Sequence, residues 1–119
     1  MSQESIKDLA MEMCAVLDEK KAKDILLMDV SNQTIIADFF IICSAQTNNT
    51  VRALYEDLDE KMSKKGLEPA RVDGVGESRW IVMDYGSILV HIFKDEDRLF
   101  YHLDRLWDSG KNITRYGEE

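Results

Sequence analysis

The 119-residue chain contains only two cysteines, Cys14 and Cys43, and both lie in apolar segments. Two such cysteines do not make the disulfide framework of a small secreted domain, and a free buried cysteine behaves as a small hydrophobic residue. The first residues, MSQESIKDLAMEM, carry acids and no long apolar run, which argues against a secretory signal or transit peptide. No stretch approaches the roughly 18 apolar residues that suggest a membrane span. We therefore expect a cytoplasmic protein that makes no membrane contact.

Positive charge is also scarce, because 15 Lys and Arg residues face 23 Asp and Glu residues and leave a net charge of −8. Binding to nucleic acid relies on a basic surface that neutralises phosphates, so this composition argues against a domain that binds nucleic acid by itself. An acidic domain instead suits a basic protein partner, since complementary charge speeds and orients the encounter.

The motifs of common catalytic and metal sites are missing as well. The sequence has no CxxC, no HxxxH and no GxxxxGK[ST] phosphate-binding loop. A nucleophilic pair of Cys43 and His91 is conceivable on neighbouring strands, but four apolar residues precede Cys43, and apolar burial raises a thiol pKa. Asp38, directly before an apolar strand, is either a functional acid or a turn residue. We therefore predict no enzymatic activity, no metal and no cofactor.

Apolar spacing and turn residues predict eight elements in the order α-β-β-α-β-β-β-α. They are a helix over 5–20, strands over 25–30 and 39–44, a helix over 51–65, a short strand over 70–73, strands over 80–83 and 88–93, and a helix over 95–107. This alternation predicts a single three-layer α/β domain, in which helices flank a mixed sheet of about five strands. We expect the domain to span residues 1–110 and residues 111–119 to form a flexible C-terminal tail.

The stretch from residue 79 to residue 107 carries most of the functional signal. Two apolar runs, 80–83 and 88–93, flank the turn-forming sequence DYGS, which predicts a β-hairpin. Alternation along the first strand predicts two sets of side chains on opposite faces: Trp80, Val82 and Asp84 on one, and Ile81, Met83 and Tyr85 on the other. Trp and Tyr are common interface anchors, but they also serve as core aromatics with a polar tip at the rim, and the sequence leaves both interpretations open.

Four segments occur in a family-specific order: ADFFIICS at 37–44, WIVMDYG at 80–86 after a glycine-rich approach, VHIF at 90–93, and RLFYHLDRLW at 98–107. Together they resemble the ribosomal silencing factor family, also called the Iojap family. The resemblance implies a nucleotidyltransferase-like fold that lacks the catalytic motif. It also implies a protein that binds ribosomal protein fourteen of the large subunit and blocks its association with the small subunit. Such a protein represses translation under nutrient limitation or in stationary phase.

Carried over to matching positions, the resemblance implies a partner-binding site at Trp80, Val82, Asp84 and Tyr85, and additionally at His91 and Lys94. In this interpretation Trp80 is the anchor that the partner buries, and Trp107 serves the fold. The resemblance further implies that the free protein forms homodimers. Two alternatives stay open: a divergent nucleotidyltransferase or phosphate-ester enzyme with its site near Asp38 and Cys43, and a protein-binding module with a non-ribosomal partner.

Overall fold

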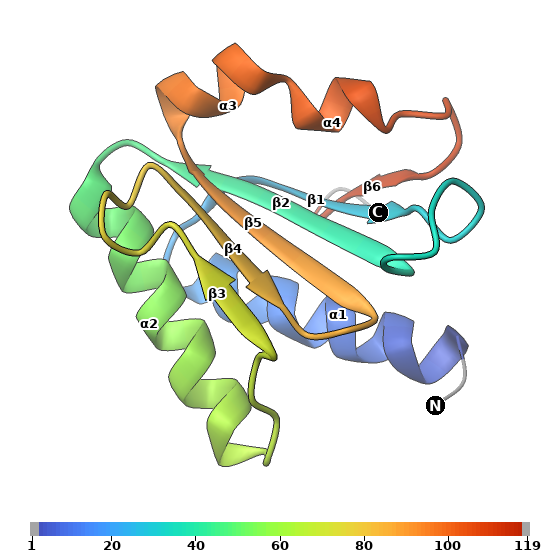
Figure 1. The fold of residues 1–119 in the computed structure, drawn as a ribbon, viewed down its shortest axis with the longest axis horizontal. Helices are drawn as coiled ribbons and strands as arrows, with labels where there is room; N and C mark the ends of the chain where they lie inside the picture. The colour runs from blue at the N-terminus through green and yellow to red at the C-terminus, as the bar shows by residue number, and fades with distance from the viewer. Residues whose placement is uncertain (1–2, 118–119) are drawn as a thin grey trace.

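Strand β2 (Phe39–Ala45) lies at the middle of the fold and is buried along its whole length. Its sequence, FFIICSA, is rich in aromatic and β-branched residues, which suit a strand covered on both faces. β2 pairs antiparallel with β1 (Lys23–Asp29) and parallel with β5 (Ile88–Lys94). Figure 1 shows the computed structural model, which describes residues 3–117.

The sheet contains six strands in the order β3-β4-β5-β2-β1-β6. β4 (Trp80–Asp84) and β5 form the antiparallel hairpin that the sequence predicts, and β3 (Arg71–Asp73) extends this hairpin at one edge. β6 (Ile113–Arg115) pairs antiparallel with β1 at the other edge. The sheet is therefore mixed, as predicted, and has one strand more than the five that we expected.

Helices cover the two sides of the sheet as separate layers (Figure 1). α1 (Gln3–Glu19) and α2 (Asn48–Lys64) lie on one side, and α3 (Asp95–Tyr101) and α4 (Leu103–Leu106) lie on the other. This arrangement confirms the predicted three-layer α/β domain. Within residues 3–117, no helix combines the length and the apolar character needed to cross a membrane.

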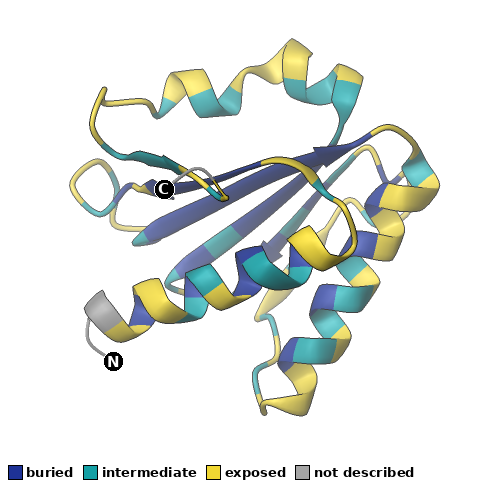
Figure 2. Ribbon diagram, turned by 180° about the vertical axis from the view of Figure 1, so that it is seen from behind, coloured by how far each residue is buried: buried dark blue, intermediate teal, exposed yellow. Residues whose placement is uncertain are grey.

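The buried side chains form two clusters, one on each side of the sheet, and Figure 2 shows how burial follows the strands and the inner helix faces. The larger cluster lies between the sheet and helices α1 and α2, and it contains Ile81 and Met83. The smaller cluster lies beneath α3 and α4 and contains Phe40 and Phe93. Trp107 packs against this smaller cluster, with its ring centroid 5.2 Å from that of Phe40, as expected for a residue that serves the fold.

Two parts of the C-terminal region differ from the expectation. The helix expected over 95–107 is interrupted at His102, whose left-handed conformation (φ 48°) separates α3 from α4. The expectation that residues 111–119 form a tail is wrong for Ile113–Arg115, because the free edge of β1 offers this segment backbone hydrogen-bond partners. Residues 118–119 of the expected tail lie outside the described residues.

Candidate functional site

Trp80, the first residue of β4, belongs to an aromatic cluster on the α3/α4 side of the sheet. Its register partner on β5 is Phe93, and the two rings stack with their centroids 4.9 Å apart. Tyr101 of α3 lies against the same indole, with a centroid distance of 4.8 Å. Trp80 is nevertheless only half-buried. The indole therefore packs against the core, as the core interpretation predicts, and it also presents part of its surface to solvent, as an interface anchor requires.

His91 lies beneath Trp80 and fixes the orientation of the indole. The Trp80 Nε1–H donates a hydrogen bond to His91 Nδ1 at 3.2 Å, across the β4–β5 pair. Burial lowers the pKa of His91 to about 4, so the ring is neutral near pH 7 and carries its proton on Nε2. His91 Nε2 is buried and has no hydrogen-bond partner among residues 3–117. His91 is only 6% exposed, so the structure places this expected partner contact under the surface.

Val82 and Asp84 follow Trp80 on the same side of β4 and are half-buried. Helices α3 and α4 run from the end of β5 toward β6, so neither helix lies over β3 or the far end of β4 (Figure 1). Strand register adds Leu89 of β5, which pairs with Asp84 and is also half-buried. We call the surface formed by Trp80, Val82, Asp84 and Leu89 the docking face. The sequence did not predict Leu89 as part of this surface, because its place beside Asp84 depends on the register between β4 and β5.

Asp84 also stabilises the turn that follows β4. Its Oδ1 accepts a hydrogen bond from the Gly86 N–H at 2.8 Å, and the Tyr85 N–H donates to the Ile88 carbonyl at 2.9 Å. Gly86 adopts φ 85°, a conformation that glycine reaches without the steric cost of a Cβ atom. The carboxylate of Asp84 therefore contributes both turn geometry and negative charge to the docking face.

Tyr85 and Lys94 lie away from the docking face. Tyr85 packs against the larger cluster on the α1/α2 side, and its hydroxyl is buried with no hydrogen-bond partner among residues 3–117. Burial raises the pKa of Tyr85, and the nearby carboxylates of Asp59 and Glu68 raise it further. Lys94 lies at the end of β5 and pairs with Glu96 at 3.4 Å. The structure thus brings together Trp80, Val82 and Asp84 but not Tyr85 or Lys94.

A hollow of about 480 Å³ opens beside Trp80, between the loop that precedes β4 and helix α3. Trp80 and Tyr101 form its aromatic walls, whereas Glu77, Arg79 and Asp97 supply charged groups. Sequence reasoning did not identify this hollow, because it exists only where Tyr101 of α3 lies against Trp80 at the start of β4. The run of acids at the start of α3 was visible in the sequence, but acids are common in the first turn of any helix.

The loop that forms one wall of this hollow is held from the opposite side of the sheet by α2. Arg52 donates from Nη2 to the carbonyls of Val75 and Gly76 at 3.1 and 3.2 Å, and from Nε to Ser78 Oγ at 3.1 Å. Gly74 adopts φ 90°, and a Cβ atom at this position would lie 2.0 Å from the Trp80 carbonyl oxygen. The close approach of Gly74 and the Arg52 hydrogen bonds together fix the loop against the start of β4.

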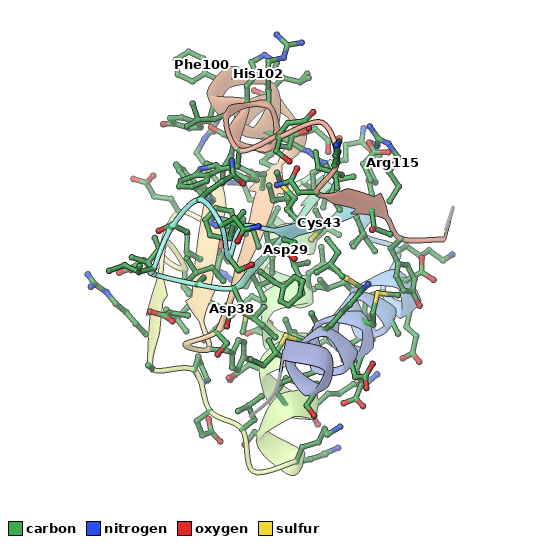
Figure 3. All side chains as sticks on the ribbon, turned by 90° about the vertical axis from the view of Figure 1, so that its right-hand side faces the viewer. Asp29, Asp38, Cys43, Phe100, His102 and Arg115 are labelled. Carbon is green, nitrogen blue, oxygen red and sulfur yellow. The ribbon has the colours of Figure 1, made fainter. Side chains whose placement is uncertain are left out.

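The geometry does not support the nucleophilic pair of Cys43 and His91. Cys43 belongs to the cluster on the α1/α2 side, whereas the ring of His91 contacts Phe40 in the cluster on the other side. Burial raises the pKa of the Cys43 thiol to about 12, so almost no thiolate forms at neutral pH. Asp38 lies five residues before Cys43, a span of roughly 16 Å in extended chain, and Figure 3 shows the two residues well separated.

Comparison with known proteins gives one consistent result. A family model described as "Ribosomal silencing factor during starvation" matches residues 3–119. The chain is 33% identical over 107 residues to ribosomal silencing factor RsfS of Bacillus subtilis, covering 90% of this chain and 88% of that protein. It is 30% identical to RsfS of Halalkalibacterium halodurans, covering 98% and 97% of the two chains. A crystal structure of a Bacillus halodurans protein superposes with a TM-score of 0.80 at 27% identity, covering 92% of this chain and 98% of that one.

Proposed function

The chain belongs to the ribosomal silencing factor family, and from this premise we propose that it binds protein fourteen of the large ribosomal subunit and thereby prevents the small subunit from joining. The family description places silencing during starvation. We propose the same setting here, with translation repressed under nutrient limitation or in stationary phase.

The observation that carries the proposal is the rigid, half-exposed indole of Trp80 at the end of an uncovered sheet face. Phe93, Tyr101 and His91 hold the ring from three directions. A ring fixed in this way loses little conformational entropy when a partner covers it, and Trp is frequent among the residues that dominate binding energy. Val82 and Leu89 add apolar area next to it on neighbouring strands.

Charge favours a basic protein partner for this surface. The chain carries a net charge of −8, and Asp84 adds a carboxylate within the docking face. Complementary charge raises the rate of encounter and suppresses wrong partners. Direct recognition of nucleic acid is not part of the proposal, because a phosphate backbone would be repelled by this balance of charge.

We propose that silencing needs no chemical step. Occupying a surface that the small subunit must contact is sufficient to prevent joining, and no bond is made or broken. Three features support this: burial raises the pKa of the Cys43 thiol, the His91 ring lies on the other side of the sheet, and roughly 16 Å of extended chain separates Asp38 from Cys43.

We propose in addition that the free protein associates with itself. Several large apolar side chains of α3 and α4 stand in solvent: Leu99 is 68%, Phe100 79% and Leu106 74% exposed. Figure 3 shows Phe100 at the outer end of the α3/α4 layer. Large apolar side chains exposed on one layer of a domain can supply a protein–protein contact.

The experiment introduces a large cation into the docking face. Val82→Arg places a long charged side chain beside Trp80, where it obstructs a partner and repels a basic one. We expect its affinity for purified large subunits to fall by at least about 30-fold, as for a residue at the centre of an interface. Sedimentation with large subunits and a subunit-joining assay measure the two consequences.

Ala53→Arg is the matched control, because Ala53 is exposed on α2, on the other side of the sheet. It introduces the same side chain and the same change in charge. If both variants remain folded and bind and silence like the wild type, the docking face is wrong. If both lose binding to the same extent, net charge and not the docking face decides the interaction.

A further inference from the structure

The hollow beside Trp80 combines aromatic walls with carboxylates. The rings of Trp80 and Tyr101 lie 4.8 Å apart and both border it. The face of an aromatic ring attracts a cation that comes within about 6 Å of the ring centroid, and the attraction is strongest for Trp. An arginine side chain suits such walls best, since its planar guanidinium stacks on rings and also donates to carboxylates.

The carboxylates at the hollow are only partly neutralised by this chain. Arg79 Nε donates a hydrogen bond to Asp97 Oδ1 at 3.3 Å. The same nitrogen lies 3.2 Å from Asp97 Oδ2, but the geometry there does not make a second hydrogen bond. Arg79 Nη2 lies 3.8 Å from the carboxylate of Glu96. Glu96 also pairs with Lys94 at 3.4 Å. The carboxylate of Glu77 makes no hydrogen bond or ion pair with any residue in the described range 3–117. One negative charge at the hollow therefore lacks a partner within the part of the chain that the structure describes.

We propose that this hollow receives a cationic side chain of the ribosomal partner, with arginine as the best fit. The inference rests on the proposed function and assigns a specific contact to it. The incoming guanidinium would lie against Trp80 and Tyr101, and it would donate to the exposed carboxylate of Glu77. Arg79, which already neutralises Asp97, would weaken this contact and not strengthen it.

This assignment predicts that substitutions of neighbouring charged residues change the affinity for large subunits in opposite directions. Glu77→Gln removes the free carboxylate and weakens binding to purified large subunits about two- to fivefold, the range for an exposed ion pair. Tyr101→Leu removes one aromatic wall and weakens binding about fivefold, the scale of a partly desolvated cation–π contact. Arg79→Gln removes the competing cation and tightens binding about twofold. Glu56→Gln is the matched control, because Glu56 is exposed on α2 and does not line the hollow.

Affinity is measured by sedimentation at two salt concentrations, and thermal unfolding establishes that each variant is folded. The inference predicts that Glu77→Gln reduces the salt dependence of binding and that Glu56→Gln does not. If Val82→Arg abolishes binding while the Glu77 and Glu56 variants behave alike and Arg79→Gln gives no gain, the cation site is refuted and the proposed function stands. If the wild type itself does not bind large subunits, both are refuted.

Discussion

His91→Phe separates the stability of the fold from the orientation of Trp80. Phenylalanine is similar in shape to the imidazole, so it maintains the ring contacts that His91 makes with Phe40 at 5.1 Å and with Phe93 at 6.3 Å. It removes the Nδ1 acceptor that the Trp80 Nε1–H uses at 3.2 Å. It also removes the buried Nε2–H that has no partner among residues 3–117.

The two changes act on stability in opposite directions. Losing the Trp80 hydrogen bond costs about 0.5–1.5 kcal/mol, whereas removing a buried donor without a partner recovers about 1–3 kcal/mol. The free energy of unfolding near pH 7 should therefore lie between about 0.5 kcal/mol below and about 2.5 kcal/mol above that of the wild type. The indole, by contrast, loses the bond that fixes its orientation. We expect affinity for large subunits to fall about five- to tenfold, which corresponds to roughly 1 kcal/mol.

Chemical unfolding, sedimentation with large subunits and tryptophan fluorescence test this prediction. In a Trp107→Phe background the emission reports on Trp80 alone, and it should shift when the Nε1–H loses its acceptor. His91→Asn is the complementary variant, because it places an amide oxygen near the position of Nδ1 but removes the ring; it should lose stability and retain more of the binding. If His91→Phe loses more than about 3 kcal/mol of stability or binds like the wild type, the positioning role of His91 is refuted.

Three further predictions concern the pH response, the loop beside the docking face and the free protein. The pKa of His91 is about 4 in the fold against 6.5 in the unfolded chain, so the unfolded state binds more protons between these values. The free energy of unfolding should therefore fall by up to about 3 kcal/mol as the pH drops from 6.5 to 4. His91→Phe should remove that part of the loss. Gly74→Ala should destabilise the protein by about 2 kcal/mol or more because of its φ and its clash with Trp80, whereas Gly76→Ala, with open space around it, should be tolerated in urea unfolding. Sedimentation velocity should show a concentration-dependent dimer that Phe100→Ser weakens; a wild-type protein that stays monomeric at high concentration contradicts self-association.

Local patterning in the sequence predicted the two faces of the hairpin correctly. Alternation with a period of two assigned Ile81 and Met83 to one side, and both are fully buried beneath α1 and α2. The same alternation assigned Trp80 and Val82 to the other side, where they are half-buried. These assignments succeed because side-chain direction in a strand is fixed by the backbone alone.

Features that depend on the pairing of distant segments could not be predicted in the same way. The hydrogen bond between Trp80 and His91 requires the register of β4 against β5, and the contact of Tyr101 with Trp80 requires α3 to fold back over the sheet. β6 forms because Ile113 pairs with Met28 at the free edge of β1. A strand of three residues is too short to show an apolar periodicity, so the sequence did not predict it. The helix break at His102 was not predicted, because the sequence there lacks the Gly or Pro that usually accompanies a helix break.

The most direct test of the central claim is a site-specific crosslink from the docking face. A photoreactive benzoylphenylalanine at position 82, and at position 53 as the control, is mixed with purified large subunits and irradiated, and the attached protein is identified by mass spectrometry. The account predicts that position 82 attaches to ribosomal protein fourteen and that position 53 does not. Attachment of position 82 to a different ribosomal protein or to ribosomal RNA, or to protein fourteen from position 53 alone, would contradict it.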